Sequence, residues 1–383
     1  MTNFLLNPGF ETGTPGNPDN WWKYTSGGVG ETYTYPAAGR VGGSSVEVTY
    51  VAANGFEAVY GQNITVESDK TYRVSGYIKT VGIAGAGGAI ITVDWVDVSS
   101  AYISSDNIAT NVSGTVDWTL YQAYITSPVN AVGAHIIIGL TNCSGSAYFD
   151  DMFFDSLPKT ETLQDNFNDN SIDASKWNNW GGAQIVETNQ ELELTTTTAA
   201  NYWGINSVNQ YDLTSSYVLF RLVDPGNLTL MNHGFALQVV KTANVDELLF
   251  QVYSNQLIAA KRVSGTYGGM VYNIYDPAVH KWLRIRESAG TTYWDYSTDG
   301  LSWTNFWSEA NPFSLTVVSI TFNVGNDLVE ASGTTSKIDD LNILGITTPT
   351  LIPLSFAQTK IWTDTFIENT VFMPAITGLS VGE

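Results

Sequence analysis

The chain has 383 residues, enough for two domains with separate hydrophobic cores. Its formal net charge is −21 and its pI is near 4.3, and this acidity argues against phosphate backbones and anionic membrane surfaces as partners, because binding there depends on Lys and Arg. We therefore expect no nucleic-acid partner. We also expect no membrane insertion, because no stretch approaches the ~20 apolar residues that a span needs. Aromatic residues make up 13% of the chain and charged residues only 14%, a composition typical of β-sandwiches.

Residues 1–157 form the first predicted unit. Apolar and polar side chains alternate in 45–50, 71–79, 89–95 and 119–125, and the runs between them contain clusters of Gly, Asn and Asp. A period of two with such breaks predicts the strands of an antiparallel sandwich. The whole chain is accordingly predicted to be all-β, with two antiparallel β-sandwich (jelly-roll) domains in tandem and an extended C-terminal tail.

Two short motifs lie at the ends of this unit. Asn-Pro-Gly-Phe-Glu occupies residues 7–11 and Ala-Tyr-Phe-Asp-Asp occupies residues 147–151, with Lys-Thr-Tyr-Arg-Val-Ser at 70–75 between them. In these motifs and their order the unit resembles the family 4/9 carbohydrate-binding modules. The resemblance implies a sugar-binding β-sandwich whose first and last strands lie side by side, so that Glu11 and Asp150 converge on one cation. Oxygen ligands of this kind suit Ca²⁺.

The resemblance also implies where a glycan binds. Family 4/9 modules place cleft residues in the strand and loop region that holds Trp95, Asp94 and Tyr102 here, and Trp21 and Trp22 lie in an early loop that can form a wall. A Trp or Tyr ring covers the apolar face of a pyranose, while neighbouring amides and carboxylates bind its hydroxyl groups. We take these five as candidate carbohydrate-binding residues. For each single aromatic ring, a place in the hydrophobic core is the competing interpretation.

Residues 158–164 are interpreted as a linker, because Pro158 and polar residues interrupt the strand pattern. Residues 165–345 form the second predicted unit. It opens with Asp-Asn-Phe-Asn-Asp at 165–169, and its later motifs include an early strand at 190–195, paired late strands at 281–287 and 293–303 with an Asp-Gly turn, and a closing strand at 336–343. In this frame the unit resembles the concanavalin A-like lectin and glucanase fold.

Candidate site residues in the second unit are fewer. Several aromatic residues lie in or near apparent loops, and we take Tyr202 and Trp203 as candidate carbohydrate contacts. Asp165 and Asp340 are expected to repeat the cation arrangement of the first unit. The alternative is that these carboxylates face water.

The sequence indicates no catalytic residues. The Glu-x-Asp-x-x-Glu strand of retaining glucanases does not occur, although a carboxylate pair from distant segments escapes this test. The three histidines are scattered, and the single Cys143 has no second thiol for a disulfide or a zinc site. We therefore expect a protein that is not an enzyme.

Residues 346–383 contain three prolines among many apolar residues. This segment is too apolar for a solvated, disordered linker. We expect this tail to dock on a protein partner or on its own second domain. The N-terminal residues lack the basic and apolar regions of a signal peptide. These two features favour a place on a virion surface, such as a phage tail or capsid, or an extracellular one.

Three functions remain open at this point. The first is a non-catalytic glycan-binding, lectin-like adhesion protein whose partner is a polysaccharide or a cell-surface glycan, in an assembly where weak sites gain avidity. The second is a purely structural virion protein without sugar binding, and the third is a glycoside hydrolase or a fragment of one. A homo-oligomer is compatible with each, because the sequence does not count subunits.

Overall fold

The computed structural model describes residues 3–26, 30–51, 57–241 and 246–344, and the predicted tail at 346–383 lies outside these ranges. The described residues form β-strands and two short 3-10 helices, η1 (Thr160–Thr162) and η2 (Gly182–Gln184), with no α-helix among them. The all-β prediction is confirmed. In the described part of the chain, no helix is both long and apolar enough to cross a membrane.

The first sandwich contains ten strands, which form one small and one large sheet. β1 pairs with β2, and the other eight strands belong to a single antiparallel sheet system. The strands are β1 (Gly13–Thr14), β2 (Asn17–Pro18), β3 (Trp22–Thr25), β4 (Glu31–Ala38), β5 (Ser44–Tyr50), β6 (Glu57–Thr65), β7 (Thr71–Val96), β8 (Tyr102–Val112), β9 (Gly114–Thr126) and β10 (Gly133–Ser156).

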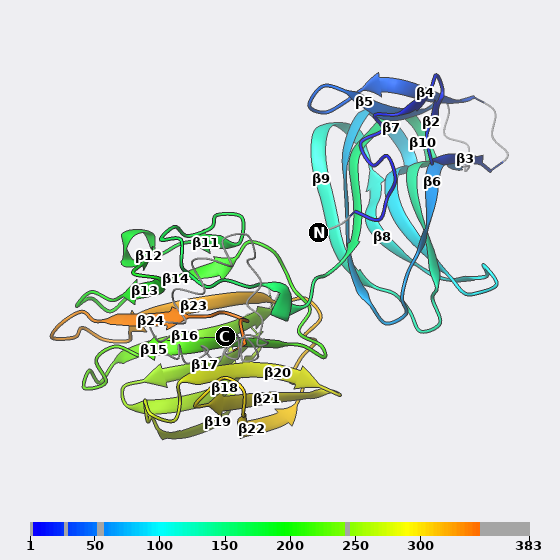
Figure 1. Cartoon of the computed structure of the whole chain (residues 1–383). Helices are drawn as coiled ribbons and strands as arrows, with labels where there is room; N and C mark the ends of the chain where they lie inside the picture. Colours follow the sequence, from blue (N-terminus) through cyan, green and yellow to red (C-terminus); the bar gives the residue numbers. More distant parts are fainter. Residues whose placement is uncertain (1–2, 27–29, 52–56, 242–245, 345–383) are drawn as a thin grey trace, which may run out of the picture. The chain divides into compact units, whose positions relative to one another are not determined.

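Two long strands, β7 and β10, build both layers of this sandwich (Figure 1). Residues 89–96 of β7 pair with β8 and with residues 133–140 of β10, whereas residues 71–80 of β7 pair with β9 and with residues 147–156 of β10. The register shifts between Thr141 and Ser146, where the strands pass from one layer to the other. The predicted strands 71–79 and 89–95 are therefore two halves of one strand.

The period-two pattern explains the packing of the first sandwich. Ile136, Ile138 and Leu140 on β10 point inward and are fully buried, as are Ile91 and Val93 on β7. Successive side chains of a strand point to opposite faces, so the residues between them face outward. Each fully buried aliphatic side chain contributes roughly 1.5 to 3 kcal/mol to folding, and this core therefore holds the outward face in place.

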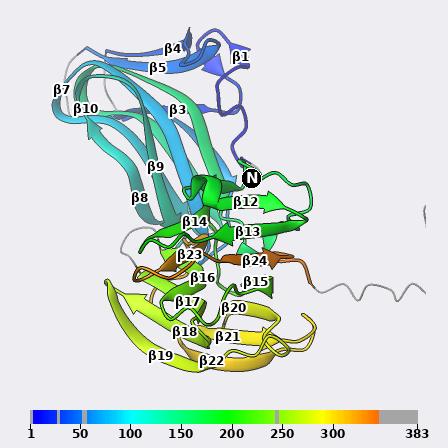
Figure 2. The same ribbon diagram turned by 90° about the vertical axis from the view of Figure 1, so that its left-hand side faces the viewer.

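The second sandwich consists of two seven-stranded antiparallel sheets, which Figure 2 shows as separate layers. The first sheet runs β11 (Trp177–Asn179), β14 (Tyr202–Ser207), β23 (Ser319–Asn326), β16 (His233–Lys241), β17 (Asp246–Tyr253), β18 (Gln256–Val263) and β19 (Thr266–Ile274). The second runs β12 (Ile185–Thr188), β13 (Glu191–Thr195), β24 (Thr335–Asp339), β15 (Tyr217–Asp224), β20 (Trp282–Ser288), β21 (Thr291–Ser297) and β22 (Thr304–Ala310).

The core of the second sandwich lies between these two sheets and includes Phe220, Phe235, Trp294 and Phe322. The strands expected at 190–195 and 281–287 are β13 and β20, and an Asp-Gly turn separates β21 from β22 as the sequence predicts. At this turn the carboxylate of Asp299 accepts backbone hydrogen bonds from two residues that follow it.

The segment 158–164, interpreted as a linker, is part of the second sandwich. Thr160 is fully buried and its hydroxyl donates to the backbone carbonyl of Tyr217 at 2.8 Å. Leu163 belongs to the core, and Asn342 donates to the carbonyl oxygens of both Thr160 and Leu163. Hydrogen bonding and burial of this backbone overrode the linker-like composition.

Candidate functional site

The outward surface of five strands in the first sandwich brings together residues from distant parts of the sequence. Cross-strand pairs align Asn63 on β6 with His135 on β10, His135 with Asp94 on β7, and Asp94 with Ser105 on β8. β3 lies at the other side of β6 and places Trp22 opposite Gly61. We call this surface, defined by these side chains together with Tyr102, the Trp22 face.

Trp22 lies flat on the Trp22 face because its cross-strand partner is a glycine. A Cβ atom at Gly61 would lie 2.2 Å from Cη2 and Cζ2 of the Trp22 ring, so the ring occupies the space of the missing side chain. The indole N–H donates to Oδ1 of Asn63 at 2.9 Å, and the ring meets that of His135 edge-on at 6.3 Å between centroids. One side of the ring is therefore covered by the strand, and the side chain as a whole is half-buried.

A row of polar groups continues across the Trp22 face from the indole. Oγ of Ser105 donates to Oδ1 of Asp94 at 2.6 Å, and the hydroxyl of Tyr102 lies 3.0 Å from the same Oγ. Tyr102 has 65% of its side chain exposed. One aromatic plane beside amide, imidazole, carboxylate and hydroxyl groups is the combination that holds a pyranose ring by its apolar face and its hydroxyls.

Two of the candidate residues in the first sandwich belong to the core, which corrects their assignment. Trp95 is fully buried, and its indole N–H donates to the carboxylate of Asp106 at 2.7 Å. Trp21 is 6% exposed, packs on Phe10 at 4.9 Å between centroids and donates its N–H to the backbone carbonyl of Asn7. Neither ring has a face that a sugar can reach.

The two ends of the first sandwich meet as the resemblance implied. The backbone N–H of Met152 donates to the carbonyl of Pro8 at 2.9 Å. Asp150 is 3% exposed, and burial raises the pKa of its carboxyl group, with Asp151 and Glu11 adding to the rise and two backbone N–H groups opposing it. The carboxylate of Glu11 occupies a cradle over Gly43, where a Cβ would lie 2.4 Å from Oε1 and where φ is +75°.

These groups fit a hard cation in part. Asp150 accepts hydrogen bonds from the backbone N–H groups of Arg40 and Asp151 at 2.8 Å each, and the Arg40 guanidinium pairs with Asp151, so the protein already supplies one positive charge here. A cation beside Asp150 and Glu11 would offset the burial of Asp150 and the remaining negative charge. Within the described ranges, no group of three or more His, Cys, Asp or Glu side chains could hold a metal ion, so a cation here would need backbone carbonyls or water as further ligands.

The corresponding carboxylates of the second sandwich already have cationic partners in the protein. Asp165 accepts the indole N–H of Trp177 at 2.9 Å and lies 3.6 Å from Nζ of Lys176. Asp340 accepts from Nε of Arg221 at 2.9 Å. Their side chains therefore do not fit a shared metal site, although the backbones of Asp165 and Leu341 do pair.

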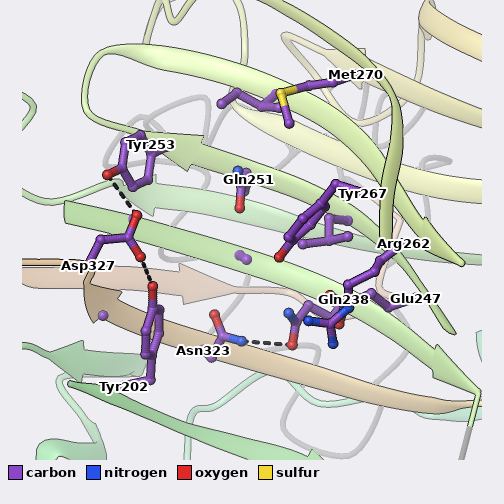
Figure 3. A pocket seen from close by; sticks show the side chains of 15 residues that line it. Tyr202, Gln238, Glu247, Gln251, Tyr253, Arg262, Tyr267, Met270, Asn323 and Asp327 are labelled. Atoms are coloured by element: carbon purple, nitrogen blue, oxygen red, sulfur yellow. Dashed lines mark hydrogen bonds and ion pairs between the residues drawn. The ribbon is translucent and has the colours of Figure 1, made fainter. Parts of the chain in front are cut away.

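The two candidates of the second sandwich are separated by the pleat of β14. Trp203 packs against the core, whereas Tyr202 is 48% exposed and lines a pocket on the outward surface of the sheet (Figure 3). This pocket has a volume of about 650 Å³. Its lining includes Tyr253, Tyr267 and Asp327, and we call it the tyrosine pocket.

Sequence reasoning missed Gly61, Asn63, His135 and Ser105. One signal was available, because a glycine inside a strand pattern often marks a close approach of another group. Nothing local identifies that group as Trp22, which lies 39 positions earlier in the chain and reaches Gly61 only through the pairing of β3 with β6. The sequence places no other metal-ligating residue near His135 and so indicates no role for it, whereas in the structure it lies beside the Trp22 ring.

The sandwich fold and the Trp22 face together define a β-sandwich with an aromatic and polar surface of the kind found in carbohydrate-binding modules. Comparison with known sequences agrees for this part of the chain. Residues 2–145 match the carbohydrate binding domain family CBM_4_9, which confirms the resemblance predicted for the first unit. The match covers less than half of the chain and does not extend to the second sandwich. No curated protein matches the chain.

Solved structures that are similar to the chain include carbohydrate-binding modules. The tandem CBM22-1-CBM22-2 domain of Paenibacillus barcinonensis Xyn10C is 12% identical with a TM-score of 0.36, over 85% of this chain and 93% of that one. A CBM4 structure is 22% identical with a TM-score of 0.29, over 39% and 98%. The enzymatically active domain of bacteriophage CBA120 tailspike protein 4 is 16% identical with a TM-score of 0.33, over 40% of this chain but only 21% of its own length.

Proposed function

We propose that the chain is a non-catalytic glycan-binding protein and that a polysaccharide or cell-surface glycan lies across the Trp22 face. The observation that supports this most directly is the half-buried Trp22 ring seated over Gly61, with a polar row beside it. A pyranose stacked on that ring places its equatorial hydroxyl groups within reach of Asn63, His135 and Asp94. The family match of residues 2–145 supports the same assignment.

In this proposal, burial of apolar surface supplies most of the binding free energy, and hydrogen bonds to the polar row fix the orientation of the sugar ring. Stacking that removes about 80 Å² of apolar surface from water gives about 2 kcal/mol at roughly 25 cal/mol per Å². Hydrogen bonds to the sugar hydroxyls replace hydrogen bonds to water, so each adds only about 1 kcal/mol net. A single site of this kind binds weakly, and repeated contacts along a polymer or among copies of the protein raise the avidity.

Binding to a panel of soluble polysaccharides, measured by affinity gel electrophoresis and then by calorimetry on those that retard the protein, tests the proposal. We expect Trp22→Ala to weaken binding about 30-fold, as follows from losing about 2 kcal/mol. Gln122→Ala, an exposed change on β9 in the other layer, is the matched control and is expected to leave affinity unchanged. Equal affinity of Trp22→Ala and wild type would reject the Trp22 face as the site.

The same experiment separates the two alternatives. A protein that binds no polysaccharide in the panel fits a purely structural role. Release of reducing ends from any of these polysaccharides indicates a glycoside hydrolase. Within the tyrosine pocket, Asp327 is engaged by two tyrosine hydroxyls and Glu247 by Arg262, which favours binding over catalysis there.

We further propose that Ca²⁺ joins the ends of the first sandwich, with Glu11 and Asp150 as its carboxylate ligands. The cradle at Gly43 and the burial of Asp150 support this. A place on a virion surface, or outside a cell, with a protein partner for residues 346–383, stays a proposal that rests on the apolar sequence of that segment.

A further inference from the structure

The tyrosine pocket lies on the opposite surface of its sheet from the core of the second sandwich. Strands β14, β23, β16, β17, β18 and β19 form its floor. Its volume of about 650 Å³ is within the range of about 300 to 1,000 Å³ found for small-molecule sites. Leu249, Ile258 and Ala260 form a separate apolar cluster with Tyr253 packed against it, and Leu249, Ile258 and Tyr253 line this floor.

Two tyrosine rings at one end of the pocket lie over glycines in a single cross-strand row. The register runs Tyr202, Gly325, Gly234 and Tyr253 across four strands. A Cβ at Gly325 would lie 2.2 Å from Cδ1 of Tyr202, and one at Gly234 would lie 2.9 Å from Cδ2 of Tyr253. The two glycines thus let both rings fold inward over the sheet.

The tyrosine hydroxyls hold Asp327 between them (Figure 3). The hydroxyl of Tyr253 donates to Oδ2 of Asp327 at 2.8 Å, and the hydroxyl of Tyr202 donates to Oδ1. Burial and this carboxylate raise the pKa of Tyr253 to about 12 and also raise that of Tyr202, so both hydroxyls keep their protons at neutral pH. The pair fixes the angle of two aromatic planes, of which Tyr202 is exposed and Tyr253 is half-buried.

The charged groups at the other end of the pocket are also paired. Glu247 is 3% exposed and lies 3.0 Å from Nε of Arg262, whose guanidinium packs over the ring of Tyr267 at 5.6 Å. Neither end therefore offers a free charge to a ligand. The chain's net charge of −21 adds repulsion against any anion that approaches.

Neutral amides occupy the middle of the pocket. Nδ2 of Asn323 donates to Oε1 of Gln238 at 2.7 Å, which leaves the Asn323 oxygen and the Gln238 nitrogen for a ligand. Gln251 projects into the pocket from β17 between the tyrosine pair and Tyr267 (Figure 3), and no hydrogen bond of its side chain is found within the described residues. Amide groups that both donate and accept match the hydroxyl groups of a sugar.

We propose that the tyrosine pocket is a second saccharide site and that its ligand is a neutral saccharide. Aromatic planes at Tyr202, Tyr253 and Tyr267 cover the apolar faces of sugar rings, and the amides of Asn323, Gln238 and Gln251 bind their hydroxyls. The tyrosine pocket shares no residue with the Trp22 face, so the proposal for one site can be correct when the proposal for the other is wrong.

An array of neutral oligosaccharides built from glucose, galactose, mannose, xylose and N-acetylglucosamine, with sialylated and uronic-acid oligosaccharides beside them, tests the proposal on the full chain. Trp22→Ala serves as the background, so that the first site is silent. In that background we expect neutral oligosaccharides to bind, with at least tenfold weaker binding when Gly325→Ala displaces the Tyr202 ring or Gln251→Ala removes the central amide.

Gly268→Ala on β19 of the same sheet is the matched control, because its Cβ would meet only Cε of Lys261 at 3.8 Å. It is expected to bind as the background does. Thermal unfolding of each variant reports whether it folds, and Gln251→Ala, which leaves the backbone and the tyrosine rings untouched, keeps the test decisive if Gly325→Ala unfolds.

The outcomes distinguish the two sites. Loss of all binding in Trp22→Ala alone overturns the second site and upholds the first. Binding that survives Trp22→Ala but falls with the pocket variants upholds the second site. If, in addition, Trp22→Ala binds as tightly as wild type, the Trp22 face is rejected as a binding site. Binding of charged oligosaccharides only, or equal binding by the pocket variants and the background, overturns the neutral-saccharide site.

Discussion

Replacing Gly61 by alanine tests the proposed binding surface without removing any aromatic or polar side chain. Ordinary contact between carbon atoms is about 3.5 to 4.0 Å, whereas the new Cβ would lie 2.2 Å from two atoms of the Trp22 ring. The ring must therefore move by more than about 1 Å, which is enough to break its 2.9 Å hydrogen bond to Asn63.

The expected cost falls on binding rather than on folding. The displaced ring loses about 2 kcal/mol of stacking and up to about 1 kcal/mol of positioning by Asn63, so we expect affinity to fall about 30- to 150-fold. Gly61 has no left-handed φ, and alanine there reduces the entropy of the unfolded chain, a gain of about 0.4 to 1 kcal/mol that offsets part of the strain.

Isothermal titration with a polysaccharide identified in the panel measures the first effect, and urea unfolding measures the second. Gln122→Ala provides the baseline for both. Affinity of Gly61→Ala within threefold of wild type, with Trp22→Ala also unchanged, would refute the reasoning that the seated ring carries the site. A large loss of stability in Gly61→Ala alone would show instead that the ring is mainly a structural support.

Three further outcomes are expected. Trp95→Ala removes a fully buried ring and should lower the free energy of unfolding by about 3 to 5 kcal/mol in urea, and a loss below 1 kcal/mol contradicts its place in the core. Burial, and then Asp169, raise the pKa of Glu187 from 4.5 to about 7, so the folded state holds an extra proton and stability is lost as pH rises from 4.5 through 7. Glu187→Gln should therefore remove this part of the decline in melting temperature with pH. A variant whose pH profile equals that of wild type would contradict this assignment. Removing Ca²⁺ with EDTA should lower the melting temperature of wild type and not of Glu11→Gln, whereas equal shifts, or none, count against the metal.

The alternation of apolar and polar residues was sufficient to predict the all-β class and several strands, because burial of one strand face imposes that period. It could not predict that the runs at 71–79 and 89–95 belong to a single strand, since both flank a glycine-rich bend that has the same composition as a loop. The linker interpretation of 158–164 failed for a related reason. Its polar residues satisfy hydrogen bonds of the second sandwich, and this depends on partners more than 50 positions away.

The site predictions were wrong for one residue in each of three adjacent pairs. The sequence predicts both members of each pair as site residues: Trp21 with Trp22, Asp94 with Trp95, and Tyr202 with Trp203. In each pair the structure turns one residue to the core and the other outward. The pleat of a strand requires this separation of adjacent residues, but which member faces outward is decided by cross-strand partners such as Gly61 and Gly325.

The continuous path of β7 and β10 through both layers of the first sandwich has a mechanical consequence. A protein that grips a long polymer is pulled whenever the polymer moves, and a load applied at His135 or Asp94 passes along unbroken backbone to the far layer. These two strands lie antiparallel over most of their length, so tension along them shears many backbone hydrogen bonds together instead of unzipping them one after another. If the Trp22 face binds a long glycan as proposed, this architecture lets the sandwich hold under drag.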